Sequence, residues 1–338
     1  MALRINLALQ GGGAHGAFSW GAIERLLEDE DIEIAGISGT SAGAMNGAAL
    51  KAGLVMGGRA AAAENLAWLW GKVGGIGDLR MANWMSAAFP APGMVSRAIE
   101  YSLPYSVADA WTRMVSPYAW GPFYRNPLKE IADAFRYDAV CADTGPALFV
   151  SATNVRTGKV RVFSGHEIGT DAILASACLP TVFQAVEIDG EAYWDGGYTG
   201  NPALFPLFGA GLPDDIVIVN INPILRDEVP REAPEILNRI NEISFNSSLL
   251  RELRAIHFVQ RLIDEGRIAE GAMKRLNIHM IADDELMTKL SVATKQVPTP
   301  ATLSAFYKAG REAAERFLSE HRAKIGRESS LDLPEMYG

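Results

Sequence analysis

A serine set among small residues is the first position in this chain whose surroundings suggest covalent chemistry. Gly39, Ser41 and Gly43 fit the G-x-S-x-G pattern of a nucleophile elbow, a sharp turn that lifts a serine hydroxyl above a sheet. The pattern is common by chance, but here it lies between an apolar run at 32–38 and a helical run of small residues at 42–53. We therefore expect Ser41 to be a nucleophile. The alternative is a serine that only caps a helix.

A glycine-rich turn precedes this serine in the sequence. Gly11, Gly13 and Gly16 satisfy G-x-G-x-x-G, with Gly12 between the first two. As a dinucleotide-binding loop of an oxidoreductase, the motif should be followed by an acid at the end of the second strand, but the nearest acids stand at its start. As an oxyanion loop, it would offer the N–H groups of Gly11, Gly12 and Gly13 to an acyl-transfer intermediate. As a tight turn, it would serve backbone geometry only. We favour the oxyanion loop.

The general base for this serine is expected to be a carboxylate. Asp195 ends a β-like run and is followed by Gly196 and Gly197, so it can approach a neighbouring backbone closely and accept the serine proton in a two-residue dyad. Taken alone, Asp-Gly-Gly would indicate only a turn. His15 lies beside the glycine turn and is expected to tune the field there or to assist. The later histidines lack a catalytic setting and are expected to be structural or exposed: His166, His257, His279 and His321.

Composition narrows the class of protein. The 338 residues are 49% hydrophobic and 21% charged, which indicates a globular fold. A formal net charge of −9 argues against a nucleic-acid partner and against electrostatic attachment to anionic membranes, so any membrane contact should be transient and hydrophobic. Cys141 and Cys178 suggest neither a disulfide nor a metal site. No signal-like segment or long apolar run is apparent. We therefore expect a cytoplasmic protein, either free or attached to the surface of a membrane. Nothing indicates the oligomeric state.

The elements that must position these residues alternate between strands and helices, which predicts an α/β fold with a mostly parallel sheet. Residues 74–125, rich in aromatics and prolines, are interpreted as a lid insertion, with ordinary core as the alternative. Residues 223–338 carry no assignable motif and form a mainly helical extension expected to lie against the core. The predicted strands are 5–10, 32–38, 147–153, 159–165, 215–222 and 277–282, with a hairpin at 185–197, and the longer predicted helices are 14–30, 42–53, 57–73, 127–136, 170–177, 234–265 and 301–324.

Together, QGGGAHG, GTSAG and DGG resemble, in this order, the patatin-like phospholipase family of lipid acyl hydrolases. The resemblance covers residues 5–222, and ASACLPTVFQAVEIDGEAYWDGGYTGNP is similar to the stretch that leads into the catalytic aspartate of the family. It implies a three-layer α/β/α sandwich, Ser41 as nucleophile, Asp195 as base, the three glycines as oxyanion loop, a lipid or other acyl-ester substrate, and no cofactor or metal. The family commonly has Arg at the position of His15 and an acid at that of Gln10, so the charge near the oxyanion site is expected to differ, and the resemblance does not determine the head-group preference.

Overall fold

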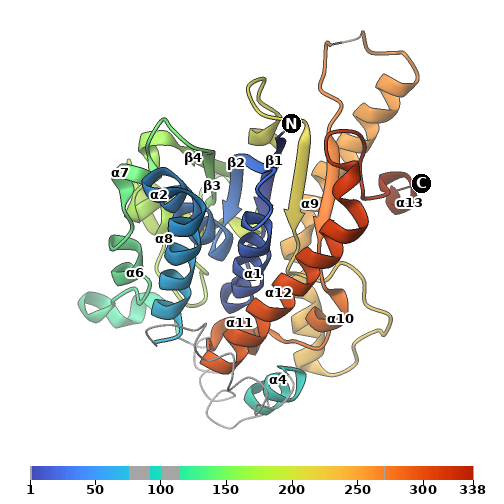
Figure 1. Ribbon diagram of the computed structural model, residues 1–338. Coiled ribbons are helices and arrows are strands. Elements are labelled where there is room, and N and C mark those ends of the chain that lie inside the picture. Colours follow the sequence, from blue (N-terminus) through green and yellow to red (C-terminus); the bar gives the residue numbers. More distant parts are fainter. Residues whose placement is uncertain (1, 76–91, 101–114, 270, 338) are drawn as a thin grey trace.

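A single mixed sheet forms the centre of the protein in a computed structural model that describes residues 2–75, 92–100, 115–269 and 271–337 (Figure 1). The strand order is β5-β6-β3-β2-β1-β7-β8, and β4 pairs additionally with β3. The five strands from β3 to β8 along this order are parallel, whereas β4 and β6 pair antiparallel with β3. The strands are β1 (Leu3–Leu9), β2 (Ile32–Thr40), β3 (Ala147–Asn154), β4 (Val160–Ser164), β5 (Val186–Ile188), β6 (Glu191–Asp195), β7 (Asp215–Val219) and β8 (Asn277–Ile281).

The order of the strands places a topological switch point beside β1. The chain proceeds outward from β1 to β2 and β3, and it later returns to lay β7 on the other side of β1. At such a point the connections that follow two neighbouring parallel strands diverge, and a crevice opens beyond their carboxyl ends. The glycine turn follows β1, Ser41 follows β2 and Asn220 follows β7, so all three lie at this edge of the sheet.

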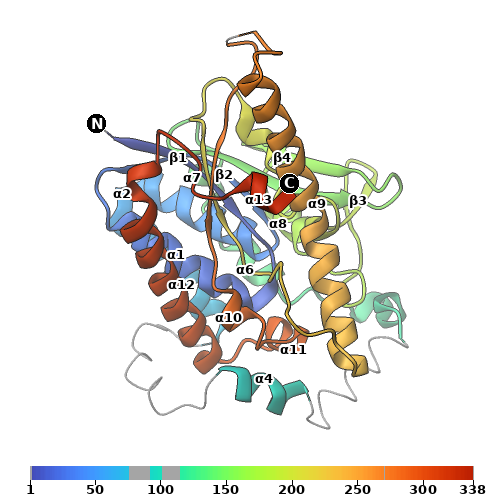
Figure 2. The same cartoon turned by 90° about the vertical axis from the view of Figure 1, so that its right-hand side faces the viewer.

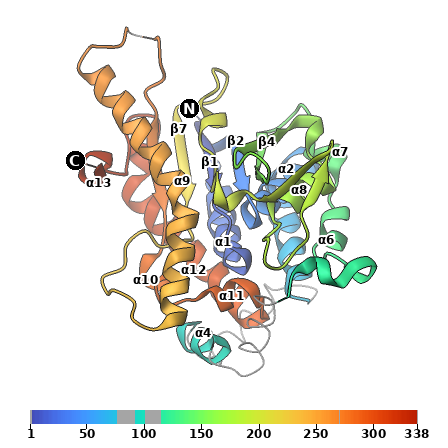
Figure 3. The same ribbon diagram turned by 180° about the vertical axis from the view of Figure 1, so that it is seen from behind.

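Helices cover both faces of the sheet, and alternate residues of the central strands enter two separate cores. Leu7 and Leu9 of β1 belong to the larger core, which they share with α1 (Gly16–Leu27), α2 (Ala42–Val73) and α12 (Pro300–His321). Ala8 belongs to the other core, which includes Leu249 of α9 (Ala233–Asp264). Figure 2 shows α1 and α12 on one side and α9 on the other, and Figure 3, seen from behind, shows α9 running along the side nearer the viewer. The predicted three-layer fold is confirmed.

The residues after 222 are built into this architecture. β8 extends the parallel sheet beyond β7, with Val217 opposite His279. α12 packs against α1 at a point where both helices carry glycine: a Cβ on Gly21 would lie 1.9 Å from the carbonyl oxygen of Tyr307, and one on Gly310 would lie 1.9 Å from that of Phe18. The C-terminal part of the described chain therefore supplies one strand to the sheet, β8, and one long helix to each face of the sheet, α12 and α9.

The remaining helices are short or peripheral. Gly57 and Gly58 interrupt α2 with non-helical backbone, which agrees with the two helices predicted there. Asp189 and Gly190 both have positive φ, 52° and 78°, as the predicted hairpin turn requires.

The predicted lid at 74–125 falls largely on 76–91 and 101–114, outside the described residues, and stays a prediction. The other helices are α4 (Pro92–Glu100), α6 (Lys129–Asp133), α7 (Tyr137–Val140), α8 (Thr170–Ser176), α10 (Asp284–Met287), α11 (Val292–Gln296) and α13 (Leu333–Tyr337), with 3-10 turns η1 (Gly13–His15), η3 (Pro117–Phe123), η4 (Gly165–Glu167), η5 (Gly196–Tyr198), η6 (Phe205–Phe208) and η7 (Arg322–Lys324).

Candidate active site

Ser41 occupies a strained turn between β2 and α2. Its backbone has φ 54° and ψ −121°, a conformation that side chains other than glycine rarely adopt and that marks functional turns. Gly43 makes the turn possible, because a Cβ there would lie 2.2 Å from the carbonyl oxygen of Leu9. Although Ser41 stands at the N-cap position of α2, its side chain makes no capping hydrogen bond. The hydroxyl group is therefore not used to cap the helix.

The backbone of the elbow is held from the side by α8. The N–H of Ser41 donates to Oγ of Ser176 at 2.8 Å, and that hydroxyl donates in turn to the carbonyl oxygen of Ser151 at 2.7 Å. These two bonds tie the turn to β3 and α8. They also occupy the Ser41 N–H, so in this structure it points to Ser176 rather than to a free site for an oxyanion.

Asp195 is buried at the end of β6 and meets the serine hydroxyl. Its Oδ1 accepts a hydrogen bond of 2.7 Å from the N–H of Gly197, and the side chain of Ser41 is close enough to act as a second donor, which lowers the pKa of the carboxyl group. The side chain is 1% exposed, and this burial raises the pKa of the Asp195 carboxyl to about 7, against the smaller lowering effect of the two hydrogen bonds. The arrangement brings together a serine hydroxyl group and a carboxyl group whose pKa is near neutrality.

The glycine turn lies directly against the elbow. A Cβ on Gly11 would be 2.7 Å from the Cβ of Ser41, so only glycine allows this approach. The N–H of Gly11 donates to Oδ1 of Asn201 at 2.6 Å and is therefore occupied. Among the described residues, no acceptor is assigned to the N–H groups of Gly12 or Gly13, and Gly13 has a φ of 58°.

A network of buried amide side chains fixes the glycine turn. Gln10 accepts through Oε1 from the backbone N–H groups of Ile221 and Asn222, at 2.9 and 3.0 Å, and donates through Nε2 to Asn246 of α9 at 3.0 Å. The carbonyl oxygen of Gly11 accepts from Nδ2 of Asn222 at 3.0 Å and from Nδ2 of Asn201 at 3.3 Å. Gln10 both donates and accepts here, which an ionised carboxylate at this position could not do.

His15 lies in the core beside the glycine turn and has no described contact with Ser41 or Asp195. Its Nε2 is 2.8 Å from Oγ1 of Thr294, whose own proton goes to the carbonyl of Ser291, so Nε2 is the protonated nitrogen. The ring meets Phe306 edge-on. Burial, together with the charge of Lys295, lowers the pKa of His15 well below its ordinary value, so the ring is neutral.

The later histidines lie apart from the serine and have other partners or exposed positions. His279 bonds to Asp215 and Ser330, and His257 stacks on Tyr337. His166 is exposed on η4, and His321 is near Phe317. None of the interactions assigned to these four histidines in the described part of the chain involves Ser41 or Asp195.

Several residues of the site lie outside the three motifs. Ser176, Asn201 and Asn222 bond to the elbow or to the glycine turn, and Lys295 of α11 bonds to Asn222. Asn222 left a signal in the sequence, because it ends the strand predicted at 215–222 and polar residues at the carboxyl ends of parallel strands commonly face a site. Ser176 lies within the stretch at 175–202 that resembles the family, although no local pattern assigned it a contact, and Lys295 has no comparable pattern.

The sequence pattern of a known family covers most of this site. The profile described as patatin-like phospholipase matches residues 7–208, which include the glycine turn, the elbow and the Asp-Gly-Gly turn. This chain belongs to the patatin-like phospholipase family. No match was found among curated proteins. The crystal structure of VipD from Legionella pneumophila is similar over 94% of this chain and 67% of that one, with 14% sequence identity and a TM-score of 0.46.

Membership of the patatin-like phospholipases supports lipid acyl ester hydrolysis in general terms. Within 2–75, 92–100, 115–269 and 271–337, no helix is long and apolar enough to cross a bilayer. The same residues contain no group of three or more His, Cys, Asp or Glu side chains placed to hold a metal ion. The chemistry that the described side chains themselves offer is proton transfer between a serine and a carboxylate.

Proposed function

We propose that this protein hydrolyses lipid acyl esters through an acyl-enzyme formed on Ser41, with Asp195 as the general base. The observation that carries the proposal is the pairing of the Ser41 side chain with the buried Asp195 carboxyl group, whose pKa it lowers as a hydrogen-bond donor, at a turn where Ser41 has a positive φ. Family membership supports the class of reaction. Neither the pairing of Ser41 with Asp195 nor the family membership would by itself distinguish a nucleophilic serine from a serine that only forms a turn.

In the proposed first half-reaction, Oγ of Ser41 attacks the ester carbonyl carbon while its proton moves to Asp195. The oxyanion that forms accepts hydrogen bonds from the N–H groups of Gly12 and Gly13, which have no assigned acceptor among the described residues. The N–H of Gly11 already donates to Asn201, so Gly11 serves only to shape the turn. The intermediate then collapses and the alcohol leaves with the proton from Asp195. The sequence predicted that the N–H groups of Gly11, Gly12 and Gly13 all donate to the oxyanion, whereas in this proposal Gly12 and Gly13 donate and Gly11 shapes the turn.

In the second half-reaction, water attacks the acyl-serine and gives its proton to Asp195. The second tetrahedral intermediate uses the same N–H donors, and its collapse returns the proton to Ser41 and releases the fatty acid. Asp195 must be ionised to accept each proton. Because its pKa is about 7, the proposed activity should rise with pH through neutrality and level off above it.

The two alternatives to this function lack a supporting contact. For a nucleotide-dependent oxidoreductase, a ribose-binding acid would be needed at the end of β2, where Thr40 and Ser41 stand. A catalytically silent patatin-like scaffold would need no base, yet a carboxylate is kept buried beside the serine at an energetic cost. We therefore favour the esterase.

A hydrophobic surface beside the site supports transient contact with a lipid surface. Ile236, Ile240 and Ile243 repeat at the spacing of one helical face on α9 and are exposed, although they are large and apolar. On the inner face of the same helix, Phe245 meets Tyr198, next to the Asp-Gly-Gly turn. A lipid surface held by this face would bring acyl chains toward Ser41. Within this proposal the protein is cytoplasmic or peripheral to a membrane, and a net charge of −9 speaks against a nucleic-acid partner.

The proposed function is tested by labelling with a fluorophosphonate, which requires an activated serine and no knowledge of the substrate. Ser41→Ala should abolish labelling and reduce ester hydrolysis to below about one per cent of the parent, because loss of a covalent nucleophile costs orders of magnitude. Asp195→Asn should abolish both as well, because the amide keeps the shape but accepts no proton.

The histidines provide the controls for this experiment. His166→Ala, on the exposed η4 turn, should leave labelling and hydrolysis within about tenfold of the parent, as should replacement of His257, His279 or His321 in a folded variant. If His15→Ala destroyed labelling while Asp195→Asn spared it, Asp195 would not be the base. A panel of phospholipids, lysophospholipids, acylglycerols, polyesters and short esters, read by mass spectrometry, would then identify the substrate class.

A further inference from the structure

The glycine turn is connected to a lysine that no motif singles out. Nζ of Lys295 donates to Oδ1 of Asn222 at 2.7 Å and to Oδ1 of Asn241 at 3.1 Å, and it lies 5.7 Å from the centroid of the Phe245 ring. The backbone of Lys295 also touches the turn, since a Cβ on Gly13 would lie 2.3 Å from its carbonyl oxygen. Lys295 therefore meets the oxyanion loop from two directions.

The side-chain amide of Asn222 lies between Lys295 and the glycine turn, and its oxygen and nitrogen face different partners. An ammonium group only donates, so the Asn222 atom facing it must be the amide oxygen, and the amide nitrogen must face the other way. That nitrogen donates to the carbonyl oxygen of Gly11. The carbonyl belongs to the peptide group whose N–H is that of Gly12. A chain of hydrogen bonds thus leads from the ammonium through Asn222 and the Gly11 carbonyl to the Gly12 N–H.

Such a chain strengthens its last donor. Each hydrogen bond polarises the next, and a bond to the carbonyl oxygen of a peptide group makes the N–H of that group a better donor. A charged donor at the start of the chain gives the largest effect, because charge-assisted hydrogen bonds are about twice as strong as neutral ones. His15 is neutral and faces Thr294, so it does not supply this charge.

We infer that Lys295 is a positioning residue for ester hydrolysis: its ammonium group, bonded to Asn222, polarises the Gly11–Gly12 peptide and aims the Gly12 N–H at the oxyanion. This inference rests on the proposed function of Ser41 and Asp195. It assigns a part of the site to α11, near the C-terminal end of the chain and outside the residues that the family profile matches.

The protonation of Lys295 gives the inference a distinctive readout. Burial lowers the pKa of its ammonium group to about 8; Glu242 of α9 acts against this shift and Arg226 adds to it. Glu242 is itself paired with Arg226 and Arg239, and His15 is the other titratable group that senses this charge. As pH rises through about 8, Lys295 loses its charge and the Gly12 N–H loses its polarisation. The rate of Ser41 labelling should therefore rise through about 7 with Asp195 and fall again above about 8.

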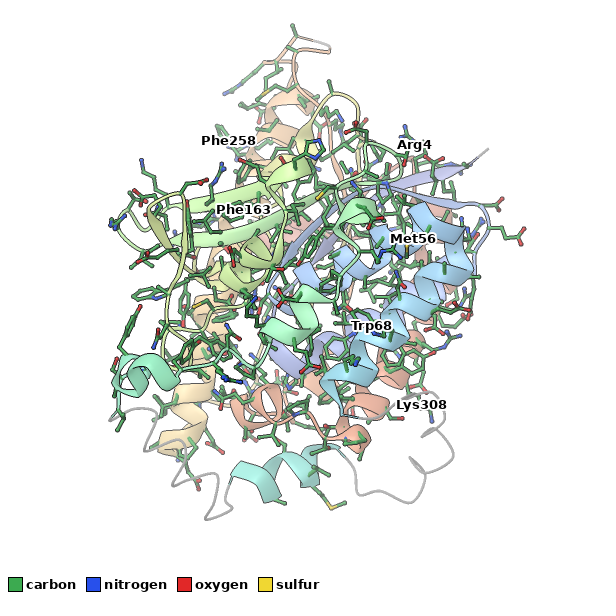
Figure 4. All side chains as sticks on the ribbon, turned by 90° about the vertical axis from the view of Figure 1, so that its left-hand side faces the viewer. Arg4, Met56, Trp68, Phe163, Phe258 and Lys308 are labelled. Carbon is green, nitrogen blue, oxygen red and sulfur yellow. The ribbon has the colours of Figure 1, made fainter. Side chains whose placement is uncertain are left out.

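The test compares the full-length parent with two substitutions in fluorophosphonate labelling from pH 6 to 10. Lys295→Gln keeps a donor for Asn222 without a charge. It should be labelled about ten- to a hundredfold more slowly at pH 7.5, and its labelling rate should no longer fall at high pH. Lys295→Arg keeps a charge that does not titrate in this range, so it should label within about threefold of the parent at pH 7.5 and stay active at pH 10. Lys308→Gln, whose parent side chain is 69% exposed on α12 (Figure 4), is the control and should match the parent throughout.

Several outcomes would overturn the inference while leaving Ser41 and Asp195 in place. One is Lys295→Gln labelling at the parental rate. Another is a uniform loss at every pH that keeps the falling limb, which would indicate a packing role. If thermal melting showed that Lys295→Gln does not fold, the parent and Lys295→Arg would decide the question. The role is refuted if the labelling rate of the parent does not fall above about pH 8, or if the rate of Lys295→Arg falls at the same pH as that of the parent. Absence of labelling in the parent at every pH would instead refute the proposed function.

Discussion

At the scale of single residues, the buried Asp195 carboxyl links activity to stability. Its pKa is about 7 in the folded protein and near 4 in an unfolded chain, so between these pH values the folded state holds a proton that the unfolded state has released. Stability should therefore fall as pH rises from about 4 to about 7 and then remain level. The two pKa values differ by about three pH units, which corresponds to roughly 4 kcal/mol at full ionisation.

Replacement of this carboxyl should make the protein more stable and inactive. We expect Asp195→Asn to exceed the parent in free energy of unfolding at pH 8 by a few kcal/mol, and the two proteins to converge near pH 4, because the amide does not ionise. Urea denaturation at both pH values measures the difference, and Asp138→Asn, at an exposed carboxylate paired with Arg136, serves as the control. A variant that is destabilised equally at pH 4 and pH 8 would show that burial does not raise the pKa of Asp195.

The predictability of the site differs from residue to residue for physical reasons. Ser41 and the glycines at 11–13 could be recognised because a turn with positive φ or a close backbone approach permits few residue types, and such constraints leave a local pattern. Asp195 could be recognised only beside the other two motifs. Asn222 and Lys295 act through long-range hydrogen bonds between segments 73 residues apart, and no local pattern records which amide or ammonium will meet which carbonyl.

At the scale of elements, α9 separates a face that builds the site from a face that we propose to meet lipid. We expect Ile240→Ser combined with Ile243→Ser to reduce hydrolysis of esters in phospholipid vesicles about tenfold, since each exposed isoleucine would contribute apolar area to the contact. Hydrolysis of a short soluble ester should be unchanged, because both side chains are exposed whereas Ser41 and Asp195 are buried.

Phe258 provides a matched control for this element. It lies on the same helix with 51% exposure, against 56% and 55% for Ile240 and Ile243, and Figure 4 shows it at the end of the molecule opposite α4. Phe258→Ser should leave both assays unchanged. Equal losses on vesicles and on the soluble ester in the double variant, with a lower melting temperature, would assign the two isoleucines to folding and remove the lipid-facing surface from the proposal.

The elements themselves were predictable in proportion to the length of their periodic pattern. The helix predicted at 234–265 is α9, Ala233–Asp264, and the strand predicted at 277–282 is β8, because long or strongly apolar segments repeat their pattern several times. α11 has five residues, Val292–Gln296, and spans little more than one turn, so it carries no period to detect. Because α11 has no period, the sequence also gives no sign that Lys295 lies near the glycine turn.

At the scale of the whole molecule, the residues after 222 are required by the sheet and by both helical layers. A chain that ends at residue 222 would leave β7 without β8, α1 without α12 and the second core without α9. We expect this fragment to aggregate and to show no fluorophosphonate labelling, because large apolar surfaces and a strand edge become exposed. Size-exclusion chromatography and labelling, each beside the full chain, are the measurements. A soluble monomeric fragment labelled at Ser41 would show instead that residues up to 222 fold and function alone.

The distance along the chain between β1 and its later neighbours also has a consequence for biosynthesis. A growing polypeptide leaves the ribosome from its N-terminus, so Ser41 emerges early, whereas β7, Asn222 and Lys295 emerge only after most of the chain has been made. Pairings between such distant segments form late, when both partners are available. On our proposal the nascent protein carries its nucleophile without a finished oxyanion loop, and cellular lipids meet an active hydrolase only after the chain has been made as far as Lys295.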